Sequence, residues 1–529
     1  MTSDVENLIR QTVDGVRPLY VAYTHAMWES ATTGAEEAGR REQEAQAALM
    51  RYWADPERYK LAKRLDEAGA GRTAIEARQL RLVHLSAAKA QQDEETIQKL
   101  TRLEAEVRQK YYNFRGRVGG EELSDNRLDD ILAKSGSSAE VREAWGASKQ
   151  IGAEVDGQVR ELARVRNSAA RAQGFRDHFQ RSLALDEIDE AELFSLFDSL
   201  EQATRVPFEE LKKGIDRERA RHFGIEVNEL RPWHYGDRFF QAPPQTGEVN
   251  LDALFNGKDP AELAKATYDG LGMEVRDILE RSDLYARPGK NQHAFCLDLD
   301  REGDIRTLNN LEPNHRWNQT LLHELGHAVY DKYVDQNLPW LLRRPPHTLS
   351  TEAVALMMGA LTFDREWLTR VAEAPAKEAE GLSRAARERE RAERLIFTRW
   401  CLVMTHFERA LYKDPDRPLD NLWWDLVQSY QQLRRPEARK APDWAAKYHI
   451  ALAPVYYQNY ELGHLVTAQL QDRIRKTVGG LAARPEAGEW LRERVFQSGA
   501  REDWSRHVAT ATGEPLNPQY FVGSVSAQQ

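Results

Sequence analysis

Apolar residues recur at helical spacing through much of the first half of the chain. Residues 35–110 are rich in Ala, Glu, Gln and Arg, and Ile97, Leu100 and Leu103 follow one another at three-residue intervals. Residues three or four apart share one face of a helix, so such runs predict amphipathic helices with one solvated face. No Gly-rich or Ser-rich linker divides the chain. We therefore predict a mostly α-helical protein, with residues 1–529 in a single domain.

The clearest strand signal lies in the middle of the chain, after a break at Pro288-Gly289. Residues 294–299 and 304–309 are strand-like, and the polar residues 300–303 between them are typical of a turn. This pattern predicts a small β-hairpin. A hairpin matters for function because an extended peptide can pair with the edge of a strand.

Composition narrows the classes of function. The chain has 74 basic and 84 acidic residues, and this mild excess of acid gives no reason to expect a nucleic-acid partner. No stretch approaches the roughly 20 apolar residues of a membrane span, and the first residues lack the apolar core of a secretion signal. Two cysteines, Cys296 and Cys401, are too few for a disulfide framework. We therefore predict a cytoplasmic protein with no membrane partner; the sequence does not indicate its oligomeric state.

The motif that carries chemistry is HELGH at residues 323–327. His323 and His327 are four residues apart, so both imidazoles can face one ion from the same side of a helix. Glu324 lies beside that face, where it can reach a water molecule without binding the metal. Imidazole and carboxylate ligands suit Zn²⁺, and a catalytic zinc site uses three protein ligands. Glu352, which follows a Pro-rich loop and is surrounded by apolar residues, is the predicted third ligand.

Other polar residues support this predicted metal site. Thr348 or Ser350 is predicted to cap the helix that carries Glu352. Asp331, one turn after His327, is predicted to accept an N–H from a ligand histidine. Two alternatives remain open: Glu352 as an acid stabilised by the helix dipole, and Asp331 as a solvated acid.

Several separated segments then agree with one known family. They are His293-Ala294, which stands 30 residues before His323, the pair Trp423-Trp424, the segment Lys447-Tyr448-His449, and the tyrosines Tyr457 and Tyr460. Over about residues 290–465 the chain resembles the angiotensin-converting-enzyme family of peptidyl-dipeptidases in its bacterial form. The N-terminal region resembles that family in helical character only. The resemblance implies a large two-lobed helical body with a deep central cleft, in which about residues 1–110 form a lid.

The resemblance also implies how a peptide would be bound. Lys447 and Tyr457 would hold its free C-terminal carboxylate, because an ammonium is a natural counter-charge for that group. His293 and the backbone of Ala294 would bind the main chain of the peptide. The alternative interpretations are a solvated lysine and an aromatic stripe in the core.

The catalytic roles follow from the same resemblance. Glu324 would act as the general base and then as the acid, and His449 and Tyr460 would stabilise the oxyanion.

Some positions depart from the family. The segment that joins the lysine to the tyrosines is one residue longer than in the animal enzymes, so Tyr456 is an alternative to Tyr457. Asn459 replaces an arginine that binds chloride, which removes the support for chloride activation. Leu356 replaces an acid, so support for the ligands must come from elsewhere. Gln241 is a candidate for the glutamine that helps to hold the carboxylate.

We therefore predict a zinc-dependent hydrolase that releases dipeptides from peptides with a free C-terminus. A metallocarboxypeptidase would hold the carboxylate one residue closer to the metal, and an oligopeptidase would not need the carboxylate. The tyrosine-rich segment also resembles that of related oligopeptidases. A helical scaffold that binds peptides without cleaving them is the alternative from another class.

Overall fold

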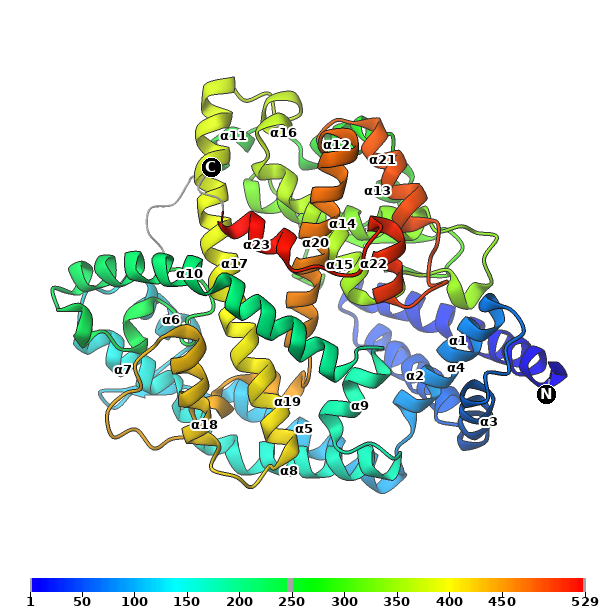
Figure 1. Cartoon of the computed structure of the whole chain (residues 1–529), viewed down its shortest axis with the longest axis horizontal. Coiled ribbons are helices and arrows are strands. Elements are labelled where there is room, and N and C mark those ends of the chain that lie inside the picture. The colour runs from blue at the N-terminus through cyan, green and yellow to red at the C-terminus, as the bar shows by residue number, and fades with distance from the viewer. Residues whose placement is uncertain (1, 245–250, 527–529) are drawn as a thin grey trace. The chain divides into compact units, whose positions relative to one another are not determined.

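The computed structural model describes residues 2–244 and 251–526. Contacts within the chain define two compact units, each built from three separate segments. Unit 1 comprises residues 1–91, 249–386 and 462–520, and unit 2 comprises residues 92–248, 387–461 and 521–529. The prediction of a mostly α-helical protein is confirmed (Figure 1). A single peptidase domain, the cleft and the lid stay predictions.

The helices make up most of each unit. Unit 1 contains α1 (Thr2–Thr33), α2 (Glu36–Trp53), α3 (Pro56–Glu67), α4 (Ala74–Ala90), α11 (Asp252–Phe255), α12 (Pro260–Gly270), α13 (Arg276–Arg281), α14 (His315–Lys332), α15 (Thr348–Gly359), α16 (Arg365–Arg370), α21 (Pro485–Leu491) and α22 (Trp504–Thr512). Unit 2 contains α5 (Glu94–Asn113), α6 (Asp125–Lys134), α7 (Ser138–Ser148), α8 (Gln150–Ala172), α9 (His178–Leu185), α10 (Glu190–Phe223), α18 (Leu419–Leu426) and α19 (Tyr448–Leu452). The helices α17 (Ala376–Lys413), α20 (Tyr457–Val478) and α23 (Gln519–Ser526) have residues in both units.

The strands of the described residues form two antiparallel hairpins. In unit 1, β3 (Phe295–Asp298) pairs with β4 (Ile305–Leu308), which confirms the predicted hairpin. In unit 2, β1 (Gly116–Val118) pairs with β2 (Glu121–Leu123). Gly119 and Gly120 both have positive φ, as a two-residue hairpin turn requires, so the sequence carried a signal for this second hairpin that the prediction missed.

The metal-motif helix α14 lies in the core of unit 1. Asn314 caps its first turn by accepting a hydrogen bond from the Trp317 N–H at 2.9 Å. Leu321, Leu325 and Val329 recur every fourth residue and are fully buried, so one face of the helix is held by packing. The position of the motif is therefore set by a stripe of apolar residues along α14.

Helix α1 packs on the hairpin beside α14. The Tyr20 hydroxyl donates to the Asp298 carbonyl at 2.8 Å, and the Thr24 hydroxyl donates to the Leu299 carbonyl at 2.7 Å. Part of the N-terminal region thus supports the end of β3. Ile97 of α5 is exposed, whereas Leu100 and Leu103 are buried, as an amphipathic helix requires.

The core of unit 2 is rich in aromatic rings. Trp423 of α18 packs against Trp400 and Phe407 of α17, with ring centroids 5.9 and 5.1 Å away. The paired tryptophans of the sequence, Trp423 and Trp424, are both buried. Trp424 also packs against Trp145 of α7, with the ring centroids 6.2 Å apart.

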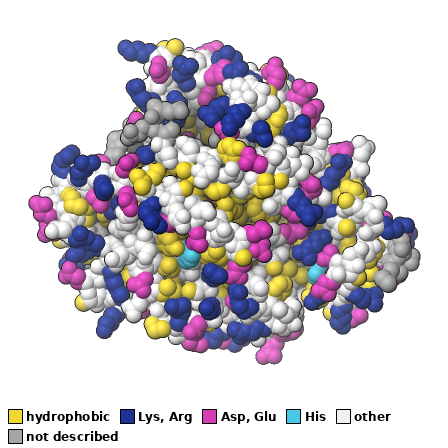
Figure 2. Space-filling view, in the orientation of Figure 1, with side chains coloured by type: hydrophobic (Ala, Val, Ile, Leu, Met, Phe, Trp, Pro, Cys, Tyr) yellow, Lys and Arg dark blue, Asp and Glu magenta, His cyan; other side chains and the backbone are white. Residues whose placement is uncertain are grey.

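The visible surface mixes charges of both signs. Figure 2 shows Lys and Arg side chains interspersed with Asp and Glu over this face, in keeping with the small net charge of −10. Among the described residues, no helix is both long and apolar enough to span a bilayer.

Candidate active site

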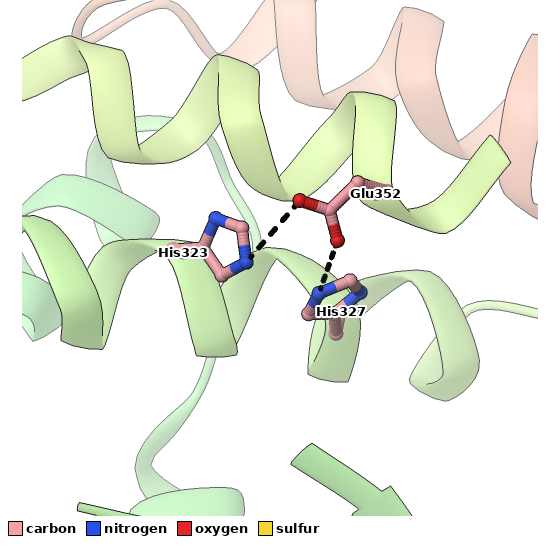
Figure 3. Close-up of side chains that lie close together, drawn as sticks. All are labelled: His323, His327 and Glu352. Carbon is pink, nitrogen blue, oxygen red and sulfur yellow. Dashed lines mark ion pairs between the residues drawn. The ribbon is translucent and has the colours of Figure 1, made fainter. Parts of the chain in front are cut away.

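Three predicted metal ligands come together in unit 1. His323 and His327 project from α14 toward Glu352, which projects from α15 (Figure 3). The His323 Nε2 atom lies 3.8 Å from one carboxylate oxygen, and the His327 Nε2 atom lies 3.5 Å from the other. Two ligand atoms bound about 2.0–2.1 Å from one tetrahedral zinc ion would be about 3.3 Å apart. The observed spacing therefore fits a small metal ion with two imidazole ligands and one carboxylate ligand.

The same helix that supplies Glu352 also holds both imidazoles. The His327 Nδ1 atom is 2.8 Å from the Thr351 hydroxyl, and the His323 ring is hydrogen-bonded to the backbone of Ala355. These contacts leave the Nε2 atom of each ring facing Glu352. Such outer contacts orient a metal ligand and fix its tautomer.

Gly326 allows the two helices to approach this closely. A Cβ atom at this position would lie 2.8 Å from the Ala355 Cα atom, closer than real Cβ contacts. The glycine within the HELGH motif is therefore a packing requirement of the α14–α15 pair.

The electrostatics of the group suit metal binding. Burial lowers the pKa of His323 to about 4, so its imidazole is neutral, as a ligand must be. Burial by itself would raise the pKa of Glu352, but the hydrogen bond from His327 and its interactions with the neighbouring histidines lower it. Burial raises the pKa of Glu324, which lies next to the ligands and is 7% exposed, to about 7.

Two predictions about supporting residues differ from what the structure shows. Asp331 was predicted to accept an N–H from a ligand histidine, but the partner of His327 Nδ1 is the Thr351 hydroxyl, and the His323 ring is bonded to the backbone of Ala355. Asp331 faces Asp298 and Arg301 instead, and burial together with the Asp298 charge raises its pKa. The cap of α15 is His347, whose Nδ1 accepts from the Leu349 N–H at 3.0 Å, so the predicted cap at Thr348 or Ser350 was wrong.

The predicted main-chain contacts lie at the start of the hairpin. His293 is exposed, and Ala294 immediately precedes β3. Within the described chain, β4 is the only strand that pairs with β3. The other edge of β3 is therefore not used by a strand.

Lys447 is buried in unit 2 within a ring of aromatic side chains. Its ammonium lies 5.3 Å from the ring centroid of Trp400, 5.4 Å from that of Phe239 and 5.7 Å from that of Tyr457. Only 7% of the residue is exposed. Its hydrogen-bond partner is the Gln241 side-chain oxygen, at 2.9 Å. Burial lowers the pKa of Lys447 to about 8.

His449 and the tyrosines lie next to this lysine in unit 2. The ring centroid of Tyr457 lies 5.1 Å from that of His449 and 5.5 Å from that of Tyr460. Burial, and after it the charge of Lys447, lowers the pKa of His449 to about 4, which leaves a neutral imidazole with one N–H to donate. Tyr457 is buried, whereas Tyr456 is 36% and Tyr460 37% exposed. Of the two adjacent tyrosines, Tyr456 and Tyr457, Tyr457 is the one whose ring lies beside the Lys447 ammonium, 5.7 Å from its centroid.

The structure therefore groups the candidate residues into two sets. The ligands and Glu324 lie in unit 1 with His293 and Ala294, and the lysine, histidine and tyrosine set lies in unit 2. Thr351 was not identified from the sequence as the partner of His327, because a threonine one residue before a metal ligand forms no recognisable motif. Gln241 was named only as a candidate, and 206 residues separate it from Lys447.

Comparisons with known proteins agree with the resemblance to peptidases found in the sequence. A family model described as "Peptidase family M3" matches residues 278–526, which include every candidate site residue except Gln241. A model described as "Angiotensin-converting enzyme" matches residues 2–208, the region that had resembled this family in helical character only.

A curated protein also matches. It is named "Carboxypeptidase 1", comes from Bacillus subtilis (strain 168), and is 24% identical over 262 residues. The match covers 44% of this chain and 52% of that protein, so the chain spans about half the length of the curated relative. Together with the two family models, this match confirms that the chain resembles metallopeptidases of the angiotensin-converting-enzyme-like kind.

Proposed function

We propose that the protein is a zinc-dependent peptidase that releases dipeptides from the C-terminal end of peptides. The observation that carries the proposal is the group His323, His327 and Glu352, whose ligand atoms lie within 4.8 Å of one another, with Glu324 beside them. Two imidazoles and one carboxylate are a ligand set of catalytic zinc sites, which keep a further position for water or substrate.

The side chains of the protein would carry the proton transfers. A bound Zn²⁺ supplies Lewis-acid chemistry, since it polarises a carbonyl group and lowers the pKa of water. Glu324 takes the proton of the attacking water on its carboxylate and then gives it to the leaving amine. His449 and Tyr460 donate hydrogen bonds to the carbonyl oxygen as it gains negative charge.

Lys447 supports the proposal that the substrate is a peptide with a free C-terminal carboxylate. Its ammonium has three donor hydrogens, and its hydrogen-bond partner in the structure is the neutral oxygen of Gln241. A carboxylate would give this buried charge a counter-ion, with Tyr457 as a second donor and Gln241 as a third. His293 and the Ala294 backbone would hold the main chain of the peptide.

A second candidate is release of single residues. The curated relative is named a carboxypeptidase, and the same ammonium would serve a substrate whose carboxylate lies one residue nearer to the metal. The two candidates differ in the mass of the product and not in the metal chemistry.

The test uses one peptide made with a free and with an amidated C-terminus. We expect cleavage of the free acid, loss of two residues in each step by mass spectrometry, and about one bound zinc per chain by metal analysis. Loss of one residue in each step would favour the carboxypeptidase. Equal cleavage of the amidated peptide would exclude both candidates and favour an oligopeptidase. A folded protein that neither contains zinc nor gains activity with added zinc would favour a non-catalytic scaffold.

A further inference from the structure

A strained residue precedes the tyrosine segment. Val455 has a φ of 55°, in the left-handed region. A β-branched side chain rarely adopts this conformation, and strained backbone persists only where surrounding contacts hold it. Val455 is buried, and it lies two residues before Tyr457, where α20 begins. The conformation of Val455 therefore sets the direction in which the tyrosines enter the helix.

Both backbone groups of Val455 are held by side chains. Its N–H donates to a carboxyl oxygen of Glu408 at 2.8 Å, and its carbonyl accepts from the Gln458 side-chain amide at 2.7 Å. Glu408 comes from α17, 47 residues away, and is 1% exposed. A buried carboxyl group is costly unless it has partners, so its contact with the backbone of a strained residue calls for an explanation.

A second side chain holds the other end of the same loop. Arg166 of α8 donates to the Ala451 carbonyl at 2.7 Å, and it also contacts Tyr412 of α17 and Glu104 of α5. The loop of residues 453–456 is thus held on both sides, through Ala451 at the end of α19 and through Val455 within the loop itself. It connects α19, which carries His449, to α20, which carries Tyr457 and Tyr460.

We propose that Glu408 is a positioning residue, which holds Val455 in its strained conformation and thereby places Tyr457 and Tyr460 relative to His449. This proposal rests on the proposed peptidase function. Burial raises the pKa of Glu408 to about 8 even though Val455 and Arg166 act in the opposite direction. The group that accepts from Val455 at neutral pH is therefore mostly a neutral carboxyl, which a glutamine side chain can replace.

The central test compares Glu408→Gln with Glu408→Met. Both replacements have a similar length, but only glutamine keeps an oxygen that can accept from Val455. We expect E408Q to keep kcat/KM for a free-acid peptide within about threefold of wild type. We expect E408M to lose about 10- to 100-fold, the scale of a small displacement of catalytic groups.

Leu411→Ala is the matched control for lost stability. Leu411 is fully buried on the same helix, and its truncation leaves a cavity without removing a hydrogen bond to the loop. We expect L411A to melt at a lower temperature and to keep kcat/KM when it is assayed below that temperature. If E408M does not fold, Gln458→Met removes the other hydrogen bond of Val455 and should give a smaller loss in the same direction.

Relief of the strain should rescue the damaged variant. Glycine adopts the left-handed region without a steric cost, so Val455→Gly reduces the need for the Glu408 contact. We expect the double variant E408M/V455G to recover part of the activity that E408M loses. Such a rescue would not follow from a general loss of packing around Glu408.

Hydrogen exchange of the Val455 amide gives a readout that does not depend on catalysis. We expect slow exchange in wild type and E408Q, and faster exchange in E408M. The proposal is overturned by wild-type kcat/KM in E408M, by an equal loss in E408Q, or by an equal loss in L411A. If the wild-type protein cleaves no peptide, the proposed function fails and the catalytic meaning of the contact fails with it. The exchange rates then decide separately whether Glu408 holds Val455.

Discussion

The two sets of candidate residues use charge in different ways. In unit 1, two imidazoles face a carboxylate across 3.5–3.8 Å, an arrangement that a cation would complete. In unit 2, a buried ammonium is surrounded by aromatic rings and one amide oxygen, an arrangement that an anion would complete. The three metal ligands and Glu324 lie within 30 residues of the sequence, whereas the second set joins residues that lie 206 apart. A local motif can therefore predict a metal site, whereas the residues that we propose to bind the substrate are brought together by the fold.

The largest expected effect concerns the base beside the metal ligands. Glu324→Gln removes the carboxylate that takes the proton and leaves all three ligands in place, so we expect kcat to fall by about 1,000-fold or more with zinc content unchanged. Peptide assays together with metal analysis check this. Glu489→Gln, an exposed acid of α21 in unit 1, is the control. Cleavage by E324Q at the wild-type rate would show that the base is another group.

The next effect concerns the ammonium of unit 2. Lys447→Met keeps much of the side-chain volume but removes the charge, so we expect a loss of about 100-fold in kcat/KM for a free-acid peptide, mostly as a higher KM. The exposed Lys440→Met, from the same segment, should leave the kinetics unchanged. A K447M enzyme that still prefers the free acid over the amide would show that Lys447 does not bind the carboxylate.

A smaller effect tests the support of the metal ligands. Thr351→Val replaces the hydroxyl that contacts His327 by a methyl group of similar size, and we expect the affinity for zinc to fall about tenfold, because the imidazole loses its orienting partner. Competition with a chromogenic chelator measures this affinity. Thr351→Ser keeps the hydroxyl and should bind zinc as wild type does. Equal affinity in T351V and T351S would remove Thr351 from the site.

The smallest effect is a dependence on pH. Burial lowers the pKa of Lys447 to about 8, so the side chain is charged below this value and loses its charge as the pH rises through it. We expect kcat/KM for the free-acid peptide to fall about fourfold between pH 7 and 8.5 relative to an amidated peptide of the same sequence. Titration of other groups of the enzyme affects both peptides equally, so it cancels in the ratio of the two kcat/KM values. A constant ratio over this range would contradict the proposed role of Lys447.

The sequence was sufficient for those parts of the site that depend on short-range geometry. Residues four apart on a helix must share a face, which is why the pairing of His323 with His327 follows from their spacing alone. Glu352 was found because a carboxylate among apolar residues needs a partner. The hairpin of β3 and β4 was found because two strand-like segments flank a polar turn.

The rest depended on contacts that no local pattern specifies. The contact of Gln241 with Lys447 arises from packing around Trp400 and Phe239. Asp331 lies one turn beyond His327 and was a reasonable partner for it, but the close approach of α15 brings Thr351 nearer. The strained Val455 could not be foreseen, because valine gives no signal for a left-handed conformation.

Gly326 has a consequence for the spacing of the three candidate metal ligands. Because its missing side chain brings the Ala355 backbone against α14, it also fixes the distance between the two histidines and Glu352. A side chain at position 326 would push α15 outward and widen the space that the three ligand atoms enclose. A wider space holds a larger, more oxygen-loving ion such as Mn²⁺ better than Zn²⁺. A substitution at this spacer residue of the motif would therefore change which ion the proposed metal site favours.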